Sequence, residues 1–230
     1  MPLPLRSVSS ALRHYYGVPT PPISRDPFQL ILWEQVAYLV PDARRRAAFA
    51  ALRSRVGLTP AALLGASTAT LTAITRLGGA IAAPERARRL RQSAELVAGH
   101  WRGDLRNALK LPLAEARKAL AQFSMIGDPG ADKILAFTHT ARILPLDSNA
   151  LRVLGRLGLA PGGKDYRAVY RRAQAAVAPE LPKSYPGLIT AGQLLRRHGQ
   201  ELCRRSAPDC GRCPLGAECP FGRELARVRR

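Results

Sequence analysis

The chain contains four cysteines, and all of them lie close together near its C-terminal end. They follow the spacing C-x6-C-x2-C-x5-C, at positions Cys203, Cys210, Cys213 and Cys219. Thiolates this close in sequence can surround one metal centre, and a segment tied to such a centre must fold compactly around it. Structural zinc sites usually take two Cys-x2-Cys pairs, whereas here one pair has a single cysteine on either side. The spacing therefore favours a cubane iron–sulfur cluster, with a structural zinc site or unrelated buried thiols as the alternatives.

The chain is strongly basic, since 36 Lys and Arg residues stand against 16 Asp and Glu residues, a formal net charge of +20. Self-repulsion of this size favours binding to a polyanion, which indicates nucleic acid first and an anionic membrane surface second. No apolar run reaches the length of a membrane span, and the N-terminus lacks a signal-peptide pattern. Because no cysteine remains for a disulfide framework, we predict a reducing, cytoplasmic environment.

The sequence predicts helices throughout, because Ala, Leu and Arg recur at helical spacing and alternating β-branched residues are scarce. Helix starts are marked at Asp26-Pro27, with Gln29 as the partner of a capping box, at Thr59-Pro60 and at Pro84-Glu85. Glycine and proline breaks bound about nine helices. The first 25 residues are expected to pack loosely or onto the second lobe, and residues 223–230 to form a mobile basic tail.

Residues 120–135 are typical of two helices joined by a tight turn at Met125-Ile126-Gly127, with the second helix beginning at Ala131. The candidates for DNA contact here are Met125, Ile126, Gly127 and Gly130. Such a hairpin directs backbone N–H groups and a helix N-terminus at one point, which suits a DNA phosphate. An ordinary helix–helix turn is the alternative, but the charge and the cysteines favour a role in binding DNA.

These features together resemble the endonuclease III-type DNA glycosylases of the helix-hairpin-helix, Gly-Pro-Asp superfamily, over roughly residues 26–220. The resemblance rests on His198-Gly199 leading into Cys203, on the segment from Pro208 to Cys219, and on residues 146–153, which are similar to the family's Val-Asp-Thr-His-x-x-Arg-Val. It implies a 4Fe–4S cluster on the four cysteines. It also implies double-stranded DNA with a damaged, mismatched or abasic site as the partner.

The family's hairpin aligns without a gap on residues 123–131, and two departures follow. Met125 stands where the family has the first hairpin glycine, and Pro129 stands where it has the lysine that forms a Schiff base. Because proline has no nucleophile, the resemblance implies removal of the base without cutting the backbone. Lys133, one turn further along the same helix face, is the candidate for a displaced amine, with Asp132 as its possible partner.

Asp147 aligns with the family's catalytic aspartate. A fixed carboxylate there would stabilise the oxocarbenium-like sugar that develops as the base departs, and could orient the attacking water. Asp147 also precedes a predicted helix over residues 148–154, so a simple N-cap is the alternative, and both roles can coexist.

Four further positions complete the set of candidates. Gln35 is a candidate to fill the gap left by an extruded nucleotide, although Tyr38 or Leu39 could occupy the matching place. Arg204 and Arg205, between the first two cysteines, suit phosphate contact. Asp128 is expected to cap the second hairpin helix, which would place a carboxylate where a phosphate should bind.

We therefore predict an all-α protein of two helical lobes with a DNA cleft between them. A helical barrel lobe over residues 29–141 would contain the hairpin, and residues 1–28 with 142–230 would form a discontinuous cluster lobe. The predicted function is a monofunctional DNA glycosylase of base excision repair. The alternatives are a DNA-binding relative without efficient catalysis and, third, a lyase using Lys133. We expect a monomer in the cytoplasm, associated with the nucleoid and not with membranes.

Overall fold

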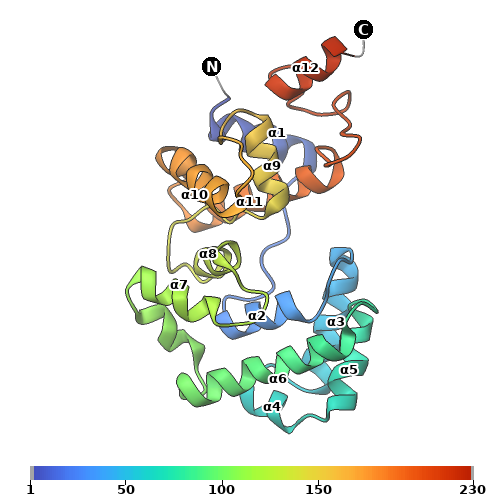
Figure 1. Cartoon of the computed structure of the whole chain (residues 1–230), viewed down its shortest axis with the longest axis vertical. Helices are drawn as coiled ribbons and strands as arrows, with labels where there is room; N and C mark the ends of the chain where they lie inside the picture. Colours follow the sequence, from blue (N-terminus) through green and yellow to red (C-terminus); the bar gives the residue numbers. More distant parts are fainter. Residues whose placement is uncertain (1–2, 229–230) are drawn as a thin grey trace. The chain divides into compact units, whose positions relative to one another are not determined.

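The computed structural model describes residues 3–228, and within that range it contains helices and no strand, as predicted. The chain divides into two compact units (Figure 1). One contains residues 22–138, and the other joins the described residues up to Pro21 with those from His139 onward. The predicted lobes divided the chain at slightly different places, after residue 28 and after residue 141. Their assignment as a barrel lobe and a cluster lobe stays a prediction, as does the cleft.

The unit of residues 22–138 is built around one long central helix. Its elements are α2 (Pro27–Gln35), α3 (Asp42–Arg55), α4 (Pro60–Gly65), α5 (Thr68–Leu77), α6 (Ala83–His100), the 3₁₀ helix η1 (Leu105–Lys110), α7 (Leu113–Ala121) and α8 (Asp128–Phe137). Helix α6 packs against α2, α4 and α5, and α7 packs against α8. Leu90, Ala94 and Val97 of α6 are fully buried, so this helix forms the centre of the core.

Helix α2 begins where the sequence predicted. The Asp26 carboxylate accepts the Gln29 N–H at 3.0 Å. The reciprocal half of the predicted capping box is made differently, because the Asp26 N–H donates to Ser24 Oγ at 2.9 Å. Thr59 caps α4 through the Ala62 N–H at 3.2 Å. These caps satisfy N–H groups that the first turn of a helix leaves without partners.

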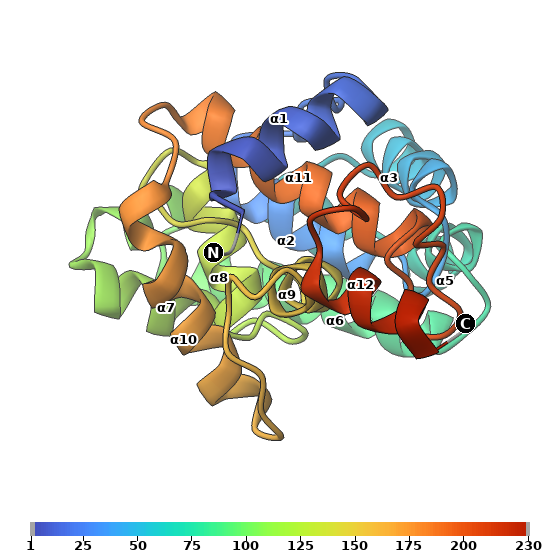
Figure 2. The same cartoon turned by 90° about the horizontal axis from the view of Figure 1, so that it is seen from above.

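The other unit is formed from both ends of the described chain. Its elements are α1 (Leu5–Tyr16), α9 (Ser148–Arg156), α10 (Tyr166–Val177), the 3₁₀ helix η2 (Ala178–Glu180), α11 (Tyr185–Glu201) and α12 (Pro220–Val228). Helix α11 packs against α9 and against α1, which lies alongside it in Figure 2. The core includes Leu5, Val8 and Leu12 of α1 together with side chains of α9, α10 and α11.

Three sequence predictions require correction. Residues 3–228 contain twelve α-helices rather than about nine, because capped starts such as Ser67 were not recognised as separate helices. Of the two alternatives for the first residues, loose packing is wrong and packing onto the second lobe is observed, since three leucine and valine side chains of α1 are buried in the core with side chains of α9, α10 and α11. The predicted basic tail is helical as far as Val228, where α12 ends, and residues 229–230 lie outside the described range. No helix of the described residues is long and apolar enough to cross a membrane.

Candidate active site and cysteine cavity

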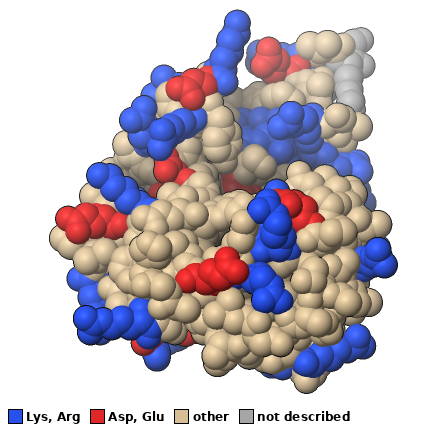
Figure 3. Space-filling view, turned by 60° about the horizontal axis from the view of Figure 1, so that its bottom comes forward, with Lys and Arg blue, Asp and Glu red and all other residues tan. Residues whose placement is uncertain are grey.

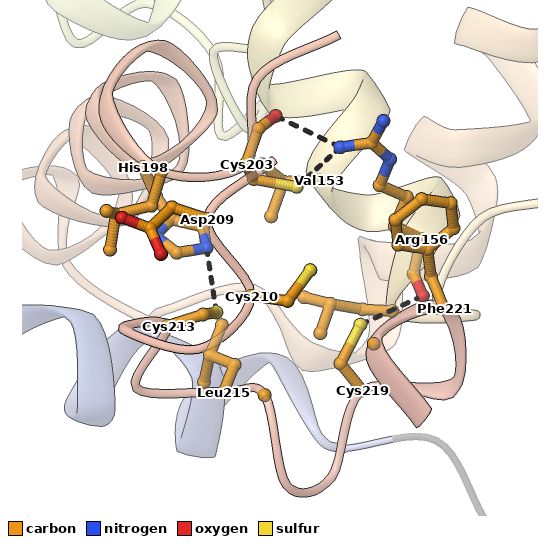
Figure 4. A pocket seen from close by; sticks show the side chains of 14 residues that line it. Val153, Arg156, His198, Cys203, Asp209, Cys210, Cys213, Leu215, Cys219 and Phe221 are labelled. Atoms are coloured by element: carbon orange, nitrogen blue, oxygen red, sulfur yellow. Dashed lines mark hydrogen bonds between the residues drawn. The ribbon is translucent and has the colours of Figure 1, made fainter. Parts of the chain in front are cut away.

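The four cysteines line a single cavity in the unit that contains α9 and α11 (Figure 4). Its other walls include Val153 and Arg156 of α9, His198 of α11, and Phe221 at the start of α12. Cys219 is buried and the other three cysteines are partly buried. Chain folding thus brings together the residues that the spacing predicted to act together.

Two side chains lie within hydrogen-bonding distance of sulfur atoms at this cavity. His198 Nε2 lies 3.5 Å from Cys213 Sγ, and its Nδ1 lies 3.0 Å from the Tyr16 hydroxyl. Burial lowers the pKa of His198 to about 4, so the imidazole is neutral and has one donor and one acceptor nitrogen. Arg156 Nη1 lies 3.3 Å from Cys203 Sγ, and its guanidinium stacks over Phe221 at 4.2 Å.

The chemistry of the four thiols fits a cationic centre. Burial first, and then the charges of the other three cysteines, raises the pKa of Cys213 to about 11. A positive centre bound to the sulfur atoms would reverse this effect and keep the thiolates deprotonated. Within residues 3–228, no group of three or more His, Cys, Asp or Glu side chains could hold a metal ion as placed. Around one zinc ion with bonds of about 2.3 Å, four sulfurs would lie only about 3.8 Å apart. The structure therefore shows four thiols that line one cavity, with the chemistry to bind a cationic metal centre.

Asp147 is the N-cap of α9, and its carboxylate is held by the start of that helix. Oδ1 accepts the N–H groups of Asn149 and Ala150, both at 2.9 Å. Oδ2 accepts from Asn149 Nδ2 at 3.2 Å and lies 3.4 Å from Arg196 Nε. The side chain is still 32% exposed. The cap that the sequence offered as the alternative is therefore present, and it leaves one face of the carboxylate open to solvent.

A chain of hydrogen bonds joins Asp147 to the cysteine loop. Beyond Asn149, the next link is Arg152 Nη2, which donates to Asn149 Oδ1 at 2.9 Å. Arg152 Nε donates to the Cys203 carbonyl at 2.9 Å, and Nη2 also donates to the Gly199 carbonyl at 2.6 Å. The position of the carboxylate and the shape of the loop therefore depend on the same arginine, which the sequence analysis did not single out.

Arg204 and Arg205, which the sequence predicts to contact phosphate, are exposed, and the Arg156 side chain holds their backbone. Arg156 donates to the Arg204 carbonyl at 2.8 Å and to the Arg205 carbonyl at 3.2 Å, and Arg204 Nη2 donates to the Ala207 carbonyl at 3.1 Å. Both residues are therefore exposed on a loop whose backbone is held by hydrogen bonds, and the Arg204 guanidinium is itself bonded to that loop.

The hairpin turn between α7 and α8 contains a strained residue. Met125 has φ +71°, in the left-handed region that favours glycine, and its side chain is exposed. The Ile126 side chain is buried and packs against Gly130, where an added Cβ would lie 3.3 Å from Ile126 Cγ2. Ile126 could therefore offer DNA only its backbone. The N-cap of α8 is Gly127 and not Asp128, which is the first residue of the helix; the expected Asp128 cap is wrong.

Gln35 does not lie on the surface, so its prediction as a DNA-contacting residue is wrong. The side chain has 0% exposure. Its Nε2 donates to the Ser124 carbonyl at 3.0 Å, and its Oε1 accepts from Ser93 Oγ at 3.0 Å. Gln35 therefore holds the backbone of the hairpin turn through a buried hydrogen bond, because Ser124 directly precedes Met125.

Lys133 is already paired, since its Nζ lies 2.7 Å from Glu34 Oε1. Asp132, which the sequence offered as a partner for this lysine, is buried and accepts from Arg117 Nε at 2.6 Å. The ion pair therefore occupies the amine that a displaced nucleophile would need.

The loops after α2 and α5 expose apolar side chains that the sequence analysis only partly recognised. Leu39 has φ +51° and is 75% exposed, and Ile81 in the facing loop is 57% exposed. The buried guanidinium of Arg86 joins the loops, donating to the carbonyls of Val36 and Gly78 at 3.0 Å each. It also donates to the carbonyls of Thr75 and Gly79. No simple sequence pattern distinguishes this buried arginine from its exposed neighbours.

The basic residues do not gather into one patch on the face drawn in Figure 3. There, Lys and Arg side chains lie in separate groups with acidic side chains between them. On this face, the net charge of +20 is therefore spread over the surface and does not define a binding site.

Comparisons with known proteins agree with these observations, although no family model matches the chain. Endonuclease III of Sulfolobus acidocaldarius is 25% identical over 199 residues, covering 86% of this chain and 83% of that protein. Adenine DNA glycosylase of Mycobacterium tuberculosis is 27% identical over 199 residues, covering 82% of this chain but only 58% of that protein. The chain thus spans little more than half the length of this second relative.

Solved structures give the same result for the fold. A trapped covalent intermediate of endonuclease III with DNA has a TM-score of 0.74 and 17% identity, covering 98% of this chain and 100% of that chain. A thermostable thymine-DNA glycosylase has a TM-score of 0.72 and 15% identity, covering 96% and 97%. The predicted all-α fold and the predicted family resemblance are confirmed.

Proposed function

We propose that this chain, which is homologous to endonuclease III and adenine DNA glycosylase and shares the fold of helix-hairpin-helix DNA glycosylases, is a DNA glycosylase of base excision repair. Its substrate would be double-stranded DNA with a damaged or mismatched base, and the reaction would be hydrolysis of the N-glycosidic bond. The nucleotide must leave the stack first, because its anomeric carbon cannot be attacked inside the duplex.

The observation that supports this function most directly is the fixed but partly exposed carboxylate of Asp147. Two backbone N–H groups hold Oδ1, so the negative charge is preorganised and needs no reorientation as the sugar becomes positive. The exposed face could also accept a proton from the attacking water. A carboxylate that served only as a cap would need no such open face.

We propose that the enzyme removes the base without cutting the backbone. Pro129 occupies the first turn of α8 and has no amine, and Lys133 is held by Glu34. Strand cleavage through an imine would require a free amine at one of these places.

We further propose that Cys203, Cys210, Cys213 and Cys219 hold a 4Fe–4S cluster, supported by their common cavity and by the Arg156 guanidinium that donates to Cys203 Sγ. When bound, the cluster would act structurally by fixing the loop between its first two ligands. Arg204 and Arg205 on that loop would then contact phosphates.

The hairpin would contact the DNA backbone through the N-terminus of α8 and the backbone of Met125, Ile126, Gly127 and Gly130. Since Gln35 is buried, we assign to Leu39 the place left by the extruded nucleotide, as one of the two alternatives considered from the sequence. A monomeric state and a cytoplasmic, nucleoid-associated location are part of the same proposal.

Single-turnover assays test the function. Duplexes carrying uracil, thymine glycol, a G·T mismatch or an abasic site would be incubated with the intact protein and with Asp147→Asn, then analysed with and without alkali. We expect alkali-dependent strand breaks that fall by about 10²–10³-fold in the variant. Asparagine is itself a good N-cap, so this substitution removes the charge and keeps the helix start.

A second candidate is a DNA-binding relative without efficient catalysis. The observation that favours it is the hairpin, where Met125 is strained and Asp128 brings a negative charge to the start of α8. Binding without any cleavage across the panel of lesions would favour this second candidate. Equal cleavage by the intact protein and Asp147→Asn would instead show an active enzyme that does not use Asp147.

A further inference from the structure

One face of helix α11 is pressed against the segment that bears Asp147. An added Cβ at Gly192 would lie 2.5 Å from Pro145 Cγ, and one at Gly199 would lie 2.7 Å from the Asn149 carbonyl oxygen. Arg196 lies between these two glycines, one helical turn from each, and so on the same face. Close packing on both sides therefore fixes the backbone from which Arg196 reaches the carboxylate.

The contact between Arg196 and Asp147 is open to solvent. Nε lies 3.4 Å from Oδ2, and the two side chains are 36% and 32% exposed. Exposed pairs of this kind are weak, so the guanidinium can exchange one anion for another. The carboxylate would stay in place after such an exchange, because Oδ1 remains bound to the N–H groups of Asn149 and Ala150.

We propose that Arg196 binds a phosphate next to the extruded nucleotide and, by doing so, leaves Asp147 with its full negative charge toward the sugar. This inference rests on the proposed glycosylase function. Each sugar of a DNA strand lies between two phosphates, so a guanidinium beside the carboxylate that faces the sugar is within reach of one of them. Arginine matches a phosphate with two parallel hydrogen bonds, a geometry that suits this oxyanion. In the absence of DNA the same group neutralises the carboxylate.

The test measures the salt dependence of DNA binding. Two duplexes would be compared, one unmodified and one with a tetrahydrofuran abasic-site analogue, for the intact protein and for Arg196→Met, Arg196→Lys and Arg197→Met. Arg197 is the matched control because it pairs with Glu201 at 2.8 Å and stacks on Tyr16, away from Asp147. Its substitution removes the same unit charge from the neighbouring position of α11.

We expect Arg196→Met to weaken binding to the analogue duplex by about 10-fold and to lower its salt slope by about 0.9, the value for one phosphate contact. Arg196→Lys should keep the slope, which would show that the methionine variant loses a charge and not its fold. Arg197→Met should leave the slope unchanged on both duplexes. In addition, Asp147→Asn should tighten binding to the analogue duplex, because Arg196 is no longer paired with the carboxylate. The same substitution should tighten binding clearly less in the Arg196→Met background, where no guanidinium is released.

Identical behaviour of Arg196→Met and Arg197→Met on the analogue duplex would overturn the inference while leaving the glycosylase function intact. An equal loss of slope on both duplexes would also overturn it, since Arg196 would then bind phosphates without regard to the extruded nucleotide. Failure of the intact protein to prefer the analogue duplex would count against the proposed function itself, and the inference would fall with it.

Discussion

Gly199 allows the closest approach between α11 and the start of α9, and its replacement by alanine tests whether this contact determines the site. In an exposed helix interior, Gly→Ala would stabilise by about 1 kcal/mol through helix propensity. Here the new Cβ would lie 2.7, 2.8 and 2.9 Å from the carbonyl oxygen, the Cβ and the carbonyl carbon of Asn149. Two of these atoms are backbone, which cannot turn aside as a flexible side chain would. Overpacking of this kind costs about 1–3 kcal/mol, so the clash should outweigh the gain.

Gly155→Ala is the matched control for this substitution. Gly155 lies within α9, is exposed, and has no atom within 4 Å of an added Cβ. Its replacement should raise the free energy of unfolding by about 0.5–1 kcal/mol. We expect Gly199→Ala to lower it by up to about 2 kcal/mol, the overpacking cost less the gain in helix propensity. At about 2–4 °C per kcal/mol, thermal unfolding should separate the two variants by several degrees in opposite directions.

The displacement should also reach the carboxylate. Asn149 binds Asp147 through both its backbone N–H and its side-chain amide, so a shift of Asn149 moves the cap. Base release should therefore slow in Gly199→Ala and stay normal in Gly155→Ala, measured by single-turnover assay at a temperature where both are folded. If Gly199→Ala were stabilised as much as Gly155→Ala, the close approach would not constrain α11, and the reasoning would be refuted.

Three further predictions concern other parts of the chain. Gln35→Leu should lower the free energy of unfolding by about 1–3 kcal/mol in a urea titration, because the Ser124 carbonyl loses its partner; unchanged stability with weaker DNA binding would instead fit a surface role. Borohydride treatment of the protein with an abasic-site duplex should give no covalent adduct, and an adduct lost on Lys133→Ala would restore the lyase function. Lys133→Ala alone should cost only about 0.2–1 kcal/mol, since its ion pair with Glu34 is partly exposed. Cys210→Ser should lower bound iron, solubility and DNA binding together, whereas normal DNA binding by iron-free protein would contradict a structural role.

The sequence was sufficient for features that depend on neighbouring residues or on fixed spacing. Asp26 and Thr59 cap their helices because a short side chain with an oxygen atom suits a helix start wherever the helix lies. The cysteines meet at one cavity because only a short stretch of chain separates them. The cap by Asp147 was likewise readable from its own segment.

Features that depend on partners distant in the chain were not readable. Gln35 lies in a helix whose apolar residues surround it on nearly all sides, so its sequence does not reveal which face is buried. Its partner Ser124 is 89 residues away. Arg86 stands among arginines that are exposed or only partly buried, and its burial depends on carbonyls from other segments that meet its guanidinium. The arginines of the last helix suggested a tail and masked Phe221, which lies at the cysteine cavity.

The placement of α1 has a consequence for the order in which the chain folds during synthesis. Leu5, Val8 and Leu12 leave the ribosome before residues 22–138, but their core partners on α9 and α11 are made after those residues. At about 5–20 residues per second, roughly 3–13 s pass between completion of residues 22–138 and emergence of the end of α11. The unit of residues 22–138 can therefore fold before the residues that cover the apolar side chains of α1 have been synthesised. Folding of the other unit must bring together α1 and helices that are more than 100 residues away along the chain, so we expect it to be the slower, later step. Until then the apolar side chains of α1 are exposed, and α1 is the segment of the nascent chain that most needs protection from aggregation.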